Sequence, residues 1–238
     1  VAGLCAVARS VGALTYVDAV HYGPHGLIDV ETLGCDFLAC SSYKFFGPHL
    51  GIVWGRQGVL AELEAYKVRP ATEELPWRFE LGTPQIELQA GLSATVAYFA
   101  WLGQMLGDSG PVRSQLTTAF DGIRVWESGL TQRLVNGLAA IDGVTIHGIR
   151  DHLDRRVATV SFTHATLPPP EIARALAERN IFVWSGNNYA LEVVRALQLD
   201  EDDGVVRIGL VHYNTPAEAD AIVEAVAEVT TRSAAPSR

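Results

Sequence analysis

The chain has 238 residues, 48% of them hydrophobic and 19% charged, and this composition predicts a packed globular core rather than disorder. Acidic residues outnumber basic ones, 27 to 18, and no cluster of Lys and Arg stands out. The net charge of -9 therefore argues against nucleic acids and anionic membranes as partners. No apolar run is long enough to span a bilayer, and three cysteines without paired spacing are typical of a reducing cytoplasm.

The first part of the chain alternates short helical and strand patterns. We expect helices over residues 1–11 and 29–33, the second capped by Asp29 and ended by Gly34, and strands over residues 13–17, 37–40 and 52–54. Short buried strands separated by helices are typical of a mostly parallel sheet that is covered on both faces. The sequence therefore predicts an α/β domain.

The rest of the chain has a different pattern. Helical patterns cover residues 58–67, 86–106 and 112–141, with an irregular stretch over 68–84. Strand patterns over 144–149, 156–163, 181–184 and 205–210 then alternate with helices over 171–179 and from Thr215 to about residue 229. We place the domain boundary between the two long helical stretches, which gives an α/β domain over residues 1–107 and a small α+β domain over residues 108–238.

Lys44 follows a buried strand in the loop Ser41-Ser42-Tyr43-Lys44-Phe45-Phe46-Gly47-Pro48. An apolar loop would desolvate the amine and favour its neutral, nucleophilic form, so Lys44 is a candidate Schiff-base lysine. The alternative is a lysine at the end of a strand whose ammonium reaches solvent.

Asp18 ends the strand before that of Lys44, and both residues are expected at the carboxyl edge of the sheet, where open α/β sheets bind ligands. Pyridoxal phosphate needs a lysine for its imine and a carboxylate beside the pyridine nitrogen, and this pair meets both needs. The alternative for Asp18 is a structural role in capping the next turn.

Four further groups have side chains that suit such a cofactor or its substrate. His21 is able to stack on a ring, and the hydroxyls of Ser41 and Tyr43 lie beside the lysine in the sequence. Thr83 is expected at a helix N-terminus, where anions bind, with a plain helix cap as the alternative. Arg207 interrupts an apolar strand and suits a substrate carboxylate, although a structural salt bridge remains the alternative.

Taken together, these motifs resemble the class V aminotransferases, pyridoxal phosphate enzymes of fold type I, and within them the cysteine desulfurase-like branch. The matching segments are Val17 to His21, Ser41 to Lys44 with Phe46-Gly47-Pro48, Arg78 to Pro84, and Arg207 with Tyr213-Asn214-Thr215. The resemblance implies part of the large cofactor-binding domain over residues 1–107 and the small carboxyl-terminal domain over 108–238. It also implies that the chain corresponds to the carboxyl-terminal portion of a longer family member.

The resemblance also implies roles for individual residues. Lys44 would hold the cofactor and move the α-proton of a small amino acid, Asp18 would pair with the pyridine nitrogen, and His21 would contact the ring hydroxyl. Ser41 and Tyr43 would bind the phosphate, and Thr83 would reach the cofactor of a partner subunit, which implies a homodimer. Arg207 would bind the substrate carboxylate, with Asn188 and Tyr189 on the facing loop.

One departure bears on the reaction. The desulfurase branch carries a cysteine on a loop of the small domain, and here the matching loop is Ser185-Gly186-Asn187-Asn188-Tyr189, with no cysteine anywhere after Cys40. A persulfide relay is therefore not expected. The alternatives to an active enzyme are a degenerate homologue that binds the cofactor weakly and a module that only dimerises or binds partners. A serine hydrolase is disfavoured because no Gly-x-Ser-x-Gly elbow surrounds Ser41 or Ser42.

Overall fold

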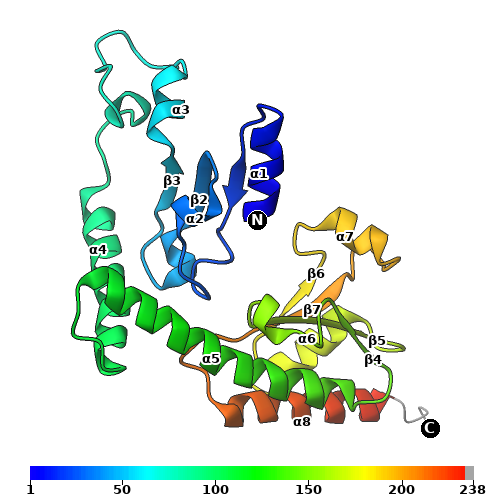
Figure 1. Cartoon of the computed structure of the whole chain (residues 1–238). Coiled ribbons are helices and arrows are strands. Elements are labelled where there is room, and N and C mark those ends of the chain that lie inside the picture. Colours follow the sequence, from blue (N-terminus) through cyan, green and yellow to red (C-terminus); the bar gives the residue numbers. More distant parts are fainter. Residues whose placement is uncertain (234–238) are drawn as a thin grey trace. The chain divides into compact units, whose positions relative to one another are not determined.

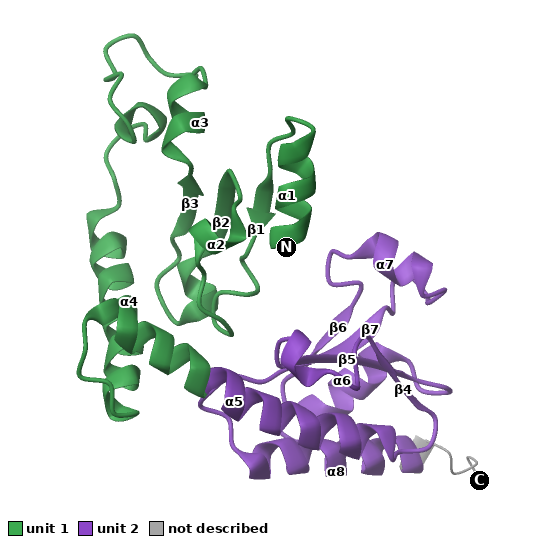
Figure 2. Cartoon of the chain, in the orientation of Figure 1, with its two compact units in different colours: residues 1–122 green, residues 123–238 purple. Residues whose placement is uncertain are grey.

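The computed structural model describes residues 1–233 and divides into two compact units, residues 1–122 and residues 123–238 (Figure 2). We call them unit 1 and unit 2. The division falls inside one long helix, 15 residues after the domain boundary that the sequence predicts at 107/108. Within the described residues, no helix is both long enough and apolar enough to cross a membrane.

Unit 1 is built around a sheet of three strands, with the order β1-β2-β3 (Figure 1). Its elements are α1 (Ala2–Ser10), β1 (Tyr16–Asp18), α2 (Val30–Leu33), β2 (Phe37–Ser41), the 3-10 turn η1 (Ser42–Phe45), β3 (Gly51–Gly55), α3 (Gln57–Glu62), the 3-10 turn η2 (Trp77–Phe79) and α4 (Ile86–Met105). β1 and β2 are parallel, whereas β3 is antiparallel to β2. The sheet is therefore mixed within unit 1, where the sequence predicts a mostly parallel one.

Local side-chain chemistry fixes the ends of the short helix α2. The Asp29 carboxylate accepts hydrogen bonds from the backbone N–H groups of Glu31 and Thr32, and Gly34 ends the helix in the left-handed conformation at φ 66°. Both features were predicted from the sequence and are confirmed. The cap orients the segment that leads into β2, and so it helps to set the strand that carries the lysine loop.

Unit 1 buries few apolar side chains. One face of its sheet packs on a small cluster of buried residues, Cys5, Ala19, Cys35 and Leu38. In contrast, Leu4, Val7 and Val11 form an exposed stripe along α1, at the three- and four-residue spacing of one helix face. Unit 1 thus leaves an apolar surface uncovered among the described residues.

A long helix, α5 (Val112–Ala139), belongs to both units because the division at 122/123 lies within it. It is continuous across Gly122, Gly129 and Gly137, in agreement with the single long helix expected from the sequence. Gly137 allows a close approach, since a Cβ there would lie 2.5 Å from a methyl group of Val223.

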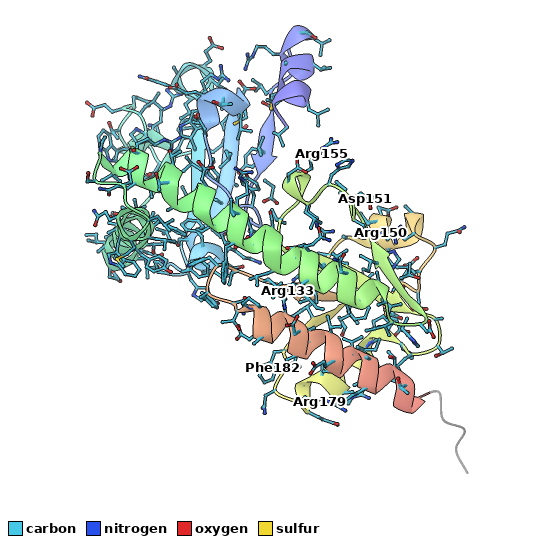
Figure 3. All side chains as sticks on the ribbon, turned by 60° about the horizontal axis from the view of Figure 1, so that its bottom comes forward. Arg133, Arg150, Asp151, Arg155, Arg179 and Phe182 are labelled. Atoms are coloured by element: carbon cyan, nitrogen blue, oxygen red, sulfur yellow. The ribbon has the colours of Figure 1, made fainter. Side chains whose placement is uncertain are left out.

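Unit 2 has an antiparallel sheet of four strands in the order β4-β5-β7-β6. Its elements after α5 are β4 (Val144–His147), the 3-10 turn η3 (Leu153–Arg155), β5 (Thr159–His164), α6 (Pro169–Ala177), β6 (Trp184–Gly186), α7 (Leu191–Ala196), β7 (Val205–Gly209) and α8 (Pro216–Ser233). One face of the sheet meets α5, α6 and α8 in a large apolar core. Figure 3 shows α5 and α8 side by side, and Arg133 of α5 donates two hydrogen bonds of 3.0 Å to Asp220 of α8.

The capping box that starts α8 is confirmed. The Glu218 N–H donates to the Thr215 hydroxyl at 3.2 Å, and the Thr215 N–H donates to the Glu218 carboxylate at 2.6 Å. α8 extends four residues beyond the predicted end at residue 229.

Two predictions about elements are wrong, and one helix was not predicted. The helix expected over residues 58–67 ends at Glu62, because the Arg78 guanidinium binds the carbonyls of Leu60, Ala61 and Leu63 at that end. The strand expected over residues 181–184 begins only at Trp184 and continues into the predicted loop. The sequence also gave no indication of α7, which follows that loop.

Candidate active site

Asp18 and the lysine loop lie at the same edge of the unit 1 sheet. Asp18 is the last residue of β1 and pairs with Ala39 of the parallel strand β2, which ends two residues later at Ser41. One Asp18 carboxylate oxygen accepts a hydrogen bond from the Val20 N–H at 2.9 Å. The side chain is exposed, so the carboxylate remains accessible to a ligand.

Ser42 holds the lysine loop in shape. This residue is fully buried, and its hydroxyl donates to the carbonyls of Pro48 and Leu50. Its backbone N–H donates to the Leu50 carbonyl at 3.0 Å, and its own carbonyl accepts from the Gly47 N–H at 2.8 Å. These hydrogen bonds join the two ends of the loop through Ser42. Because its hydroxyl already donates to backbone carbonyls, it has a structural role and is not a candidate phosphate ligand.

Two residues allow the loop to turn tightly. Phe46 adopts the left-handed conformation at φ 69°, directly after the 3-10 turn that contains Lys44. A Cβ on Gly47 would lie 2.8 Å from the Thr95 hydroxyl oxygen, so the loop needs glycine where it passes α4.

Lys44 itself is exposed, and its Nζ lies 5.4 Å from the centre of the Tyr43 ring. The desolvation expected from the apolar loop is therefore wrong for the described chain, because Lys44 is exposed although aromatic residues flank it on both sides. Tyr43 is stacked on His49 with ring centres 4.8 Å apart. The amine thus lies over the Tyr43 ring, which is itself stacked on His49.

Lys44 and Lys67 are the two lysines of the chain, and they differ sharply. The Lys67 side chain is only 9% exposed, with its Nζ 2.7 Å from the Glu73 carboxylate and 2.9 Å from the Ala71 carbonyl. Its ammonium is held by an ion pair, whereas Lys44 is accessible. Lys44 is therefore the side-chain amine available to an aldehyde.

The other residues predicted for the cofactor lie in unit 1 at varied positions. His21 is exposed and stacks on His25 with ring centres 5.7 Å apart, and Ser41 ends β2 opposite Gly51. Thr83 is exposed, but the expectation that it lies at a helix N-terminus is wrong, because α4 begins at Ile86 with Gln85 as its cap.

A cavity of about 850 Å³ lies in unit 1, over the face of the sheet that the buried cluster leaves free. Tyr16, Phe37 and Val53 line it from the sheet, and Phe79 and Thr83 line it from the segment before α4. Asp18 and Lys44 are not among its lining residues. The pair of residues proposed to hold the cofactor and this cavity are therefore separate features of unit 1.

The residues predicted for the substrate all belong to unit 2. Arg207 is the central residue of β7, is partly buried, and makes no hydrogen bond or ion pair with any described residue. Asn188 and Tyr189 both have left-handed backbones, at φ 55° and 60°, and Tyr189 is fully exposed. A bulky residue at positive φ is uncommon and marks a loop whose shape its surroundings impose.

Sequence reasoning missed two features of the lysine loop. One is the stacking of His49 on Tyr43 across the turn at Gly47 and Pro48. The sequence of this segment predicts a turn, but it does not indicate that His49 contacts Tyr43. The structural role of Ser42 depends on which of two adjacent serines points inward, and alternation along β2 does not extend into the 3-10 turn that holds it.

The donor set of unit 1 fits pyridoxal phosphate. It combines an accessible amine at Lys44, a carboxylate at Asp18 on the neighbouring strand end, and two hydroxyl-bearing residues, Ser41 and Tyr43, close to Lys44 in the chain. These groups match an aldehyde, a pyridine nitrogen and a phosphate in turn.

Comparison with known proteins covers almost the whole chain. Residues 1–109 and 112–222 match the family model described as Aminotransferase class-V. The aminotransferase-like protein FGM3 of Gibberella zeae is 33% identical over 220 residues, which are 90% of this chain and 51% of that protein. A probable cysteine desulfurase of Streptomyces coelicolor is 30% identical over 234 residues, which are 93% of this chain and 51% of that protein.

Solved structures agree with these sequence matches. The apo structure of the cysteine desulfurase from Thermococcus onnurineus NA1 superposes with a TM-score of 0.82 at 27% identity, over 98% of this chain and 56% of that one. The cysteine desulfurase CsdA of Escherichia coli, at 24% identity and a TM-score of 0.78, shows the same fold. The chain spans about half the length of the curated relatives it matches.

Proposed function

Because the chain belongs to the class V aminotransferase family, whose members depend on pyridoxal phosphate, we propose that it holds this cofactor through the Nζ of Lys44 and acts on a small amino acid. The observation that carries the proposal is the contrast between its two lysines. Lys44 is exposed at the sheet edge that also carries Asp18, whereas the Lys67 ammonium is held by Glu73.

Bound pyridoxal phosphate supplies an electron sink that stabilises negative charge at the α-carbon of an amino acid. In the proposed mechanism the Asp18 carboxylate would hold the pyridine nitrogen of the cofactor in its protonated form. The Lys44 amine would hold the cofactor aldehyde, and when free it would take the proton from the substrate α-carbon as a general base. The exposure of Lys44 supports this double role, since the amine must move between the two tasks.

Hydroxyls and an imidazole complete the proposed cofactor site. Ser41 and Tyr43 donate hydrogen bonds to the phosphate, and His21 contacts the ring hydroxyl. Thr83 serves the site of a second copy in a homodimer, which is consistent with its exposure in unit 1. Three free cysteines are consistent with a reducing cytoplasm as the compartment.

The substrate groups are proposed in unit 2. Arg207 binds the substrate carboxylate, a role supported by its free guanidinium in an otherwise apolar strand, and Asn188 and Tyr189 face the substrate from their strained loop. No cysteine follows Cys40 in the sequence, so the proposed chemistry is proton abstraction at the α-carbon without a persulfide relay.

The test uses the full chain and its two lysines. The purified chain is mixed with pyridoxal phosphate, its visible absorbance is recorded, and borohydride then fixes the bound cofactor for peptide mass spectrometry. We expect a pyridoxyl label on Lys44 and none on Lys67. Lys44→Arg should abolish the label and the absorbance band, whereas Lys67→Arg, the matched control, should retain both.

Each other outcome has a definite meaning. An unlabelled Lys44 in the wild-type chain would refute the proposal. If Lys44 is labelled but the absorbance band of the bound cofactor does not change when small amino acids are added, the alternative of an inactive homologue that binds the cofactor is favoured.

A further inference from the structure

Four side chains form one transverse row across the sheet of unit 2. The strand register pairs His147 with Ser161, Ser161 with Arg207, and Arg207 with Trp184, so the row crosses β4, β5, β7 and β6 in order. Residues paired in this way project from the same face of a sheet.

The row faces away from the helices. The next residues along three of these strands, Ile146, Phe162 and Val206, are buried in the core that the sheet shares with α5, α6 and α8. Val183, just before Trp184, packs against the same core. Because side chains alternate along a strand, the row of His147, Ser161, Arg207 and Trp184 occupies the opposite face.

Arg207 brings the one permanent charge of this row. Its guanidinium has no carboxylate partner in the described part of the chain, and its cross-strand neighbours are a hydroxyl at Ser161 and an indole at Trp184. At the far end of the row, His147 Nε2 lies 2.9 Å from the Thr163 hydroxyl, and burial lowers the pKa of His147, so this ring is neutral at neutral pH. A ligand that lies along this row therefore meets one cation and otherwise uncharged groups.

Trp184 presents an exposed aromatic surface beside Arg207. Its side chain is 59% exposed although it lies within a strand, directly across from Arg207. Directly opposed side chains have Cβ atoms about 5 Å apart, so the indole is within reach of the remainder of a small molecule whose carboxylate binds the guanidinium. An indole at that place offers a broad apolar surface and no charge.

Resting on the proposed role of Arg207 in binding a carboxylate, we infer that Trp184 determines which substrates the enzyme accepts. The ligand is an amino acid with an uncharged, apolar side chain, which lies on the indole while its carboxylate binds Arg207. Acidic and basic side chains are disfavoured, because the row of four residues holds no second charge to pair with them.

The experiment measures binding to the full chain through its tryptophan indole N–H signals in NMR spectra, without added cofactor. The sequence has five tryptophans, and Trp184→Phe assigns the signal of Trp184. The ligands are L-leucine, L-alanine and L-aspartate at millimolar concentrations. We expect leucine to bind about tenfold more tightly than alanine, as partial burial of three extra carbons predicts. The Trp184 signal should shift, while that of Trp126, the other exposed tryptophan of unit 2, should not.

Variants separate this inference from the role of Arg207. Trp184→Ser should bring leucine to the affinity of alanine and leave alanine within twofold, whereas Trp126→Phe should keep the tenfold preference. Arg207→Gln should remove binding of all three ligands.

Two results would overturn the inference in distinguishable ways. If Arg207→Gln abolishes binding but the preference for leucine is unchanged in Trp184→Ser, or if aspartate binds as well as leucine, the selectivity of Trp184 is refuted while the role of Arg207 stands. If none of the three ligands binds to the wild-type chain, the carboxylate site and the selectivity both fail.

Discussion

Replacing Ser42 by alanine should lower the free energy needed to open the lysine loop, and the hydrogen bonds of Ser42 determine by how much. The Ser42 hydroxyl donates to the carbonyls of Pro48 and Leu50 from a fully buried position. Both carbonyls keep a backbone donor after the substitution, since Leu50 N–H donates to Pro48 and Ser42 N–H donates to Leu50. The substitution therefore removes hydrogen bonds without leaving a buried carbonyl unpaired. The expected cost is that of a net hydrogen bond, about 1 kcal/mol, rather than the 2–3 kcal/mol (roughly) of an orphaned group.

Hydrogen exchange followed by mass spectrometry is the suitable assay, because it reports local opening of the loop. A loss of about 1 kcal/mol corresponds to roughly fivefold faster exchange in peptides that contain Ser42 and Gly47. Peptides from unit 2 should be unchanged. Ser93→Ala serves as the control, since the Ser93 hydroxyl is exposed and donates only to the Gln89 carbonyl within α4. Exchange of the loop peptides at the wild-type rate would refute the conclusion that Ser42 holds the loop closed.

Two further predictions concern unit 2. Thr215→Ala should lower the stability of unit 2 by about 1 kcal/mol, because it removes the N-cap of α8; urea unfolding measures this, and an unchanged midpoint would contradict the capping role. Burial lowers the pKa of His147 below its ordinary value of 6.5, so the unfolded chain takes up this proton first as the pH falls. Stability should therefore decrease as the pH drops below 6.5 and level off below the folded pKa. His147→Gln, which is able to keep the bond to Thr163, should remove that decrease, and an identical pH dependence in both proteins would show that His147 does not cause it.

The features that the sequence predicted well are those that neighbouring residues determine. Asp29 and Gly34 bound α2 by direct contact with its backbone, and Thr215 with Glu218 starts α8 in the same way. The positions of Asp18 and Lys44 near the ends of parallel strands follow from local apolar runs and from the rule that ligands bind at that edge.

Features that depend on distant residues were not predictable in this way. The prediction of a strand over residues 181–184 was wrong. Ile181 and Val183 are apolar because they pack against the core, but they do not pair with β7, and pairing begins only at Trp184. The exposure of Lys44 depends on how the loop closes around Ser42, and the alignment of Trp184 with Arg207 depends on a register between strands 23 residues apart. Nothing in a local pattern encodes either arrangement.

The helix α5 has a consequence for the order in which the chain folds. Its carboxyl-terminal part supplies Leu130, Leu134 and Leu138 to the large core of unit 2, whereas the part before Gly122 lies in unit 1, which has little core of its own. Starting a helix is the unfavourable step, and extending an existing helix adds one hydrogen bond for each residue that is fixed. Unit 2 is therefore expected to acquire structure first and to nucleate α5, so that the part of this helix that belongs to unit 1 forms by extension of a helix that already exists.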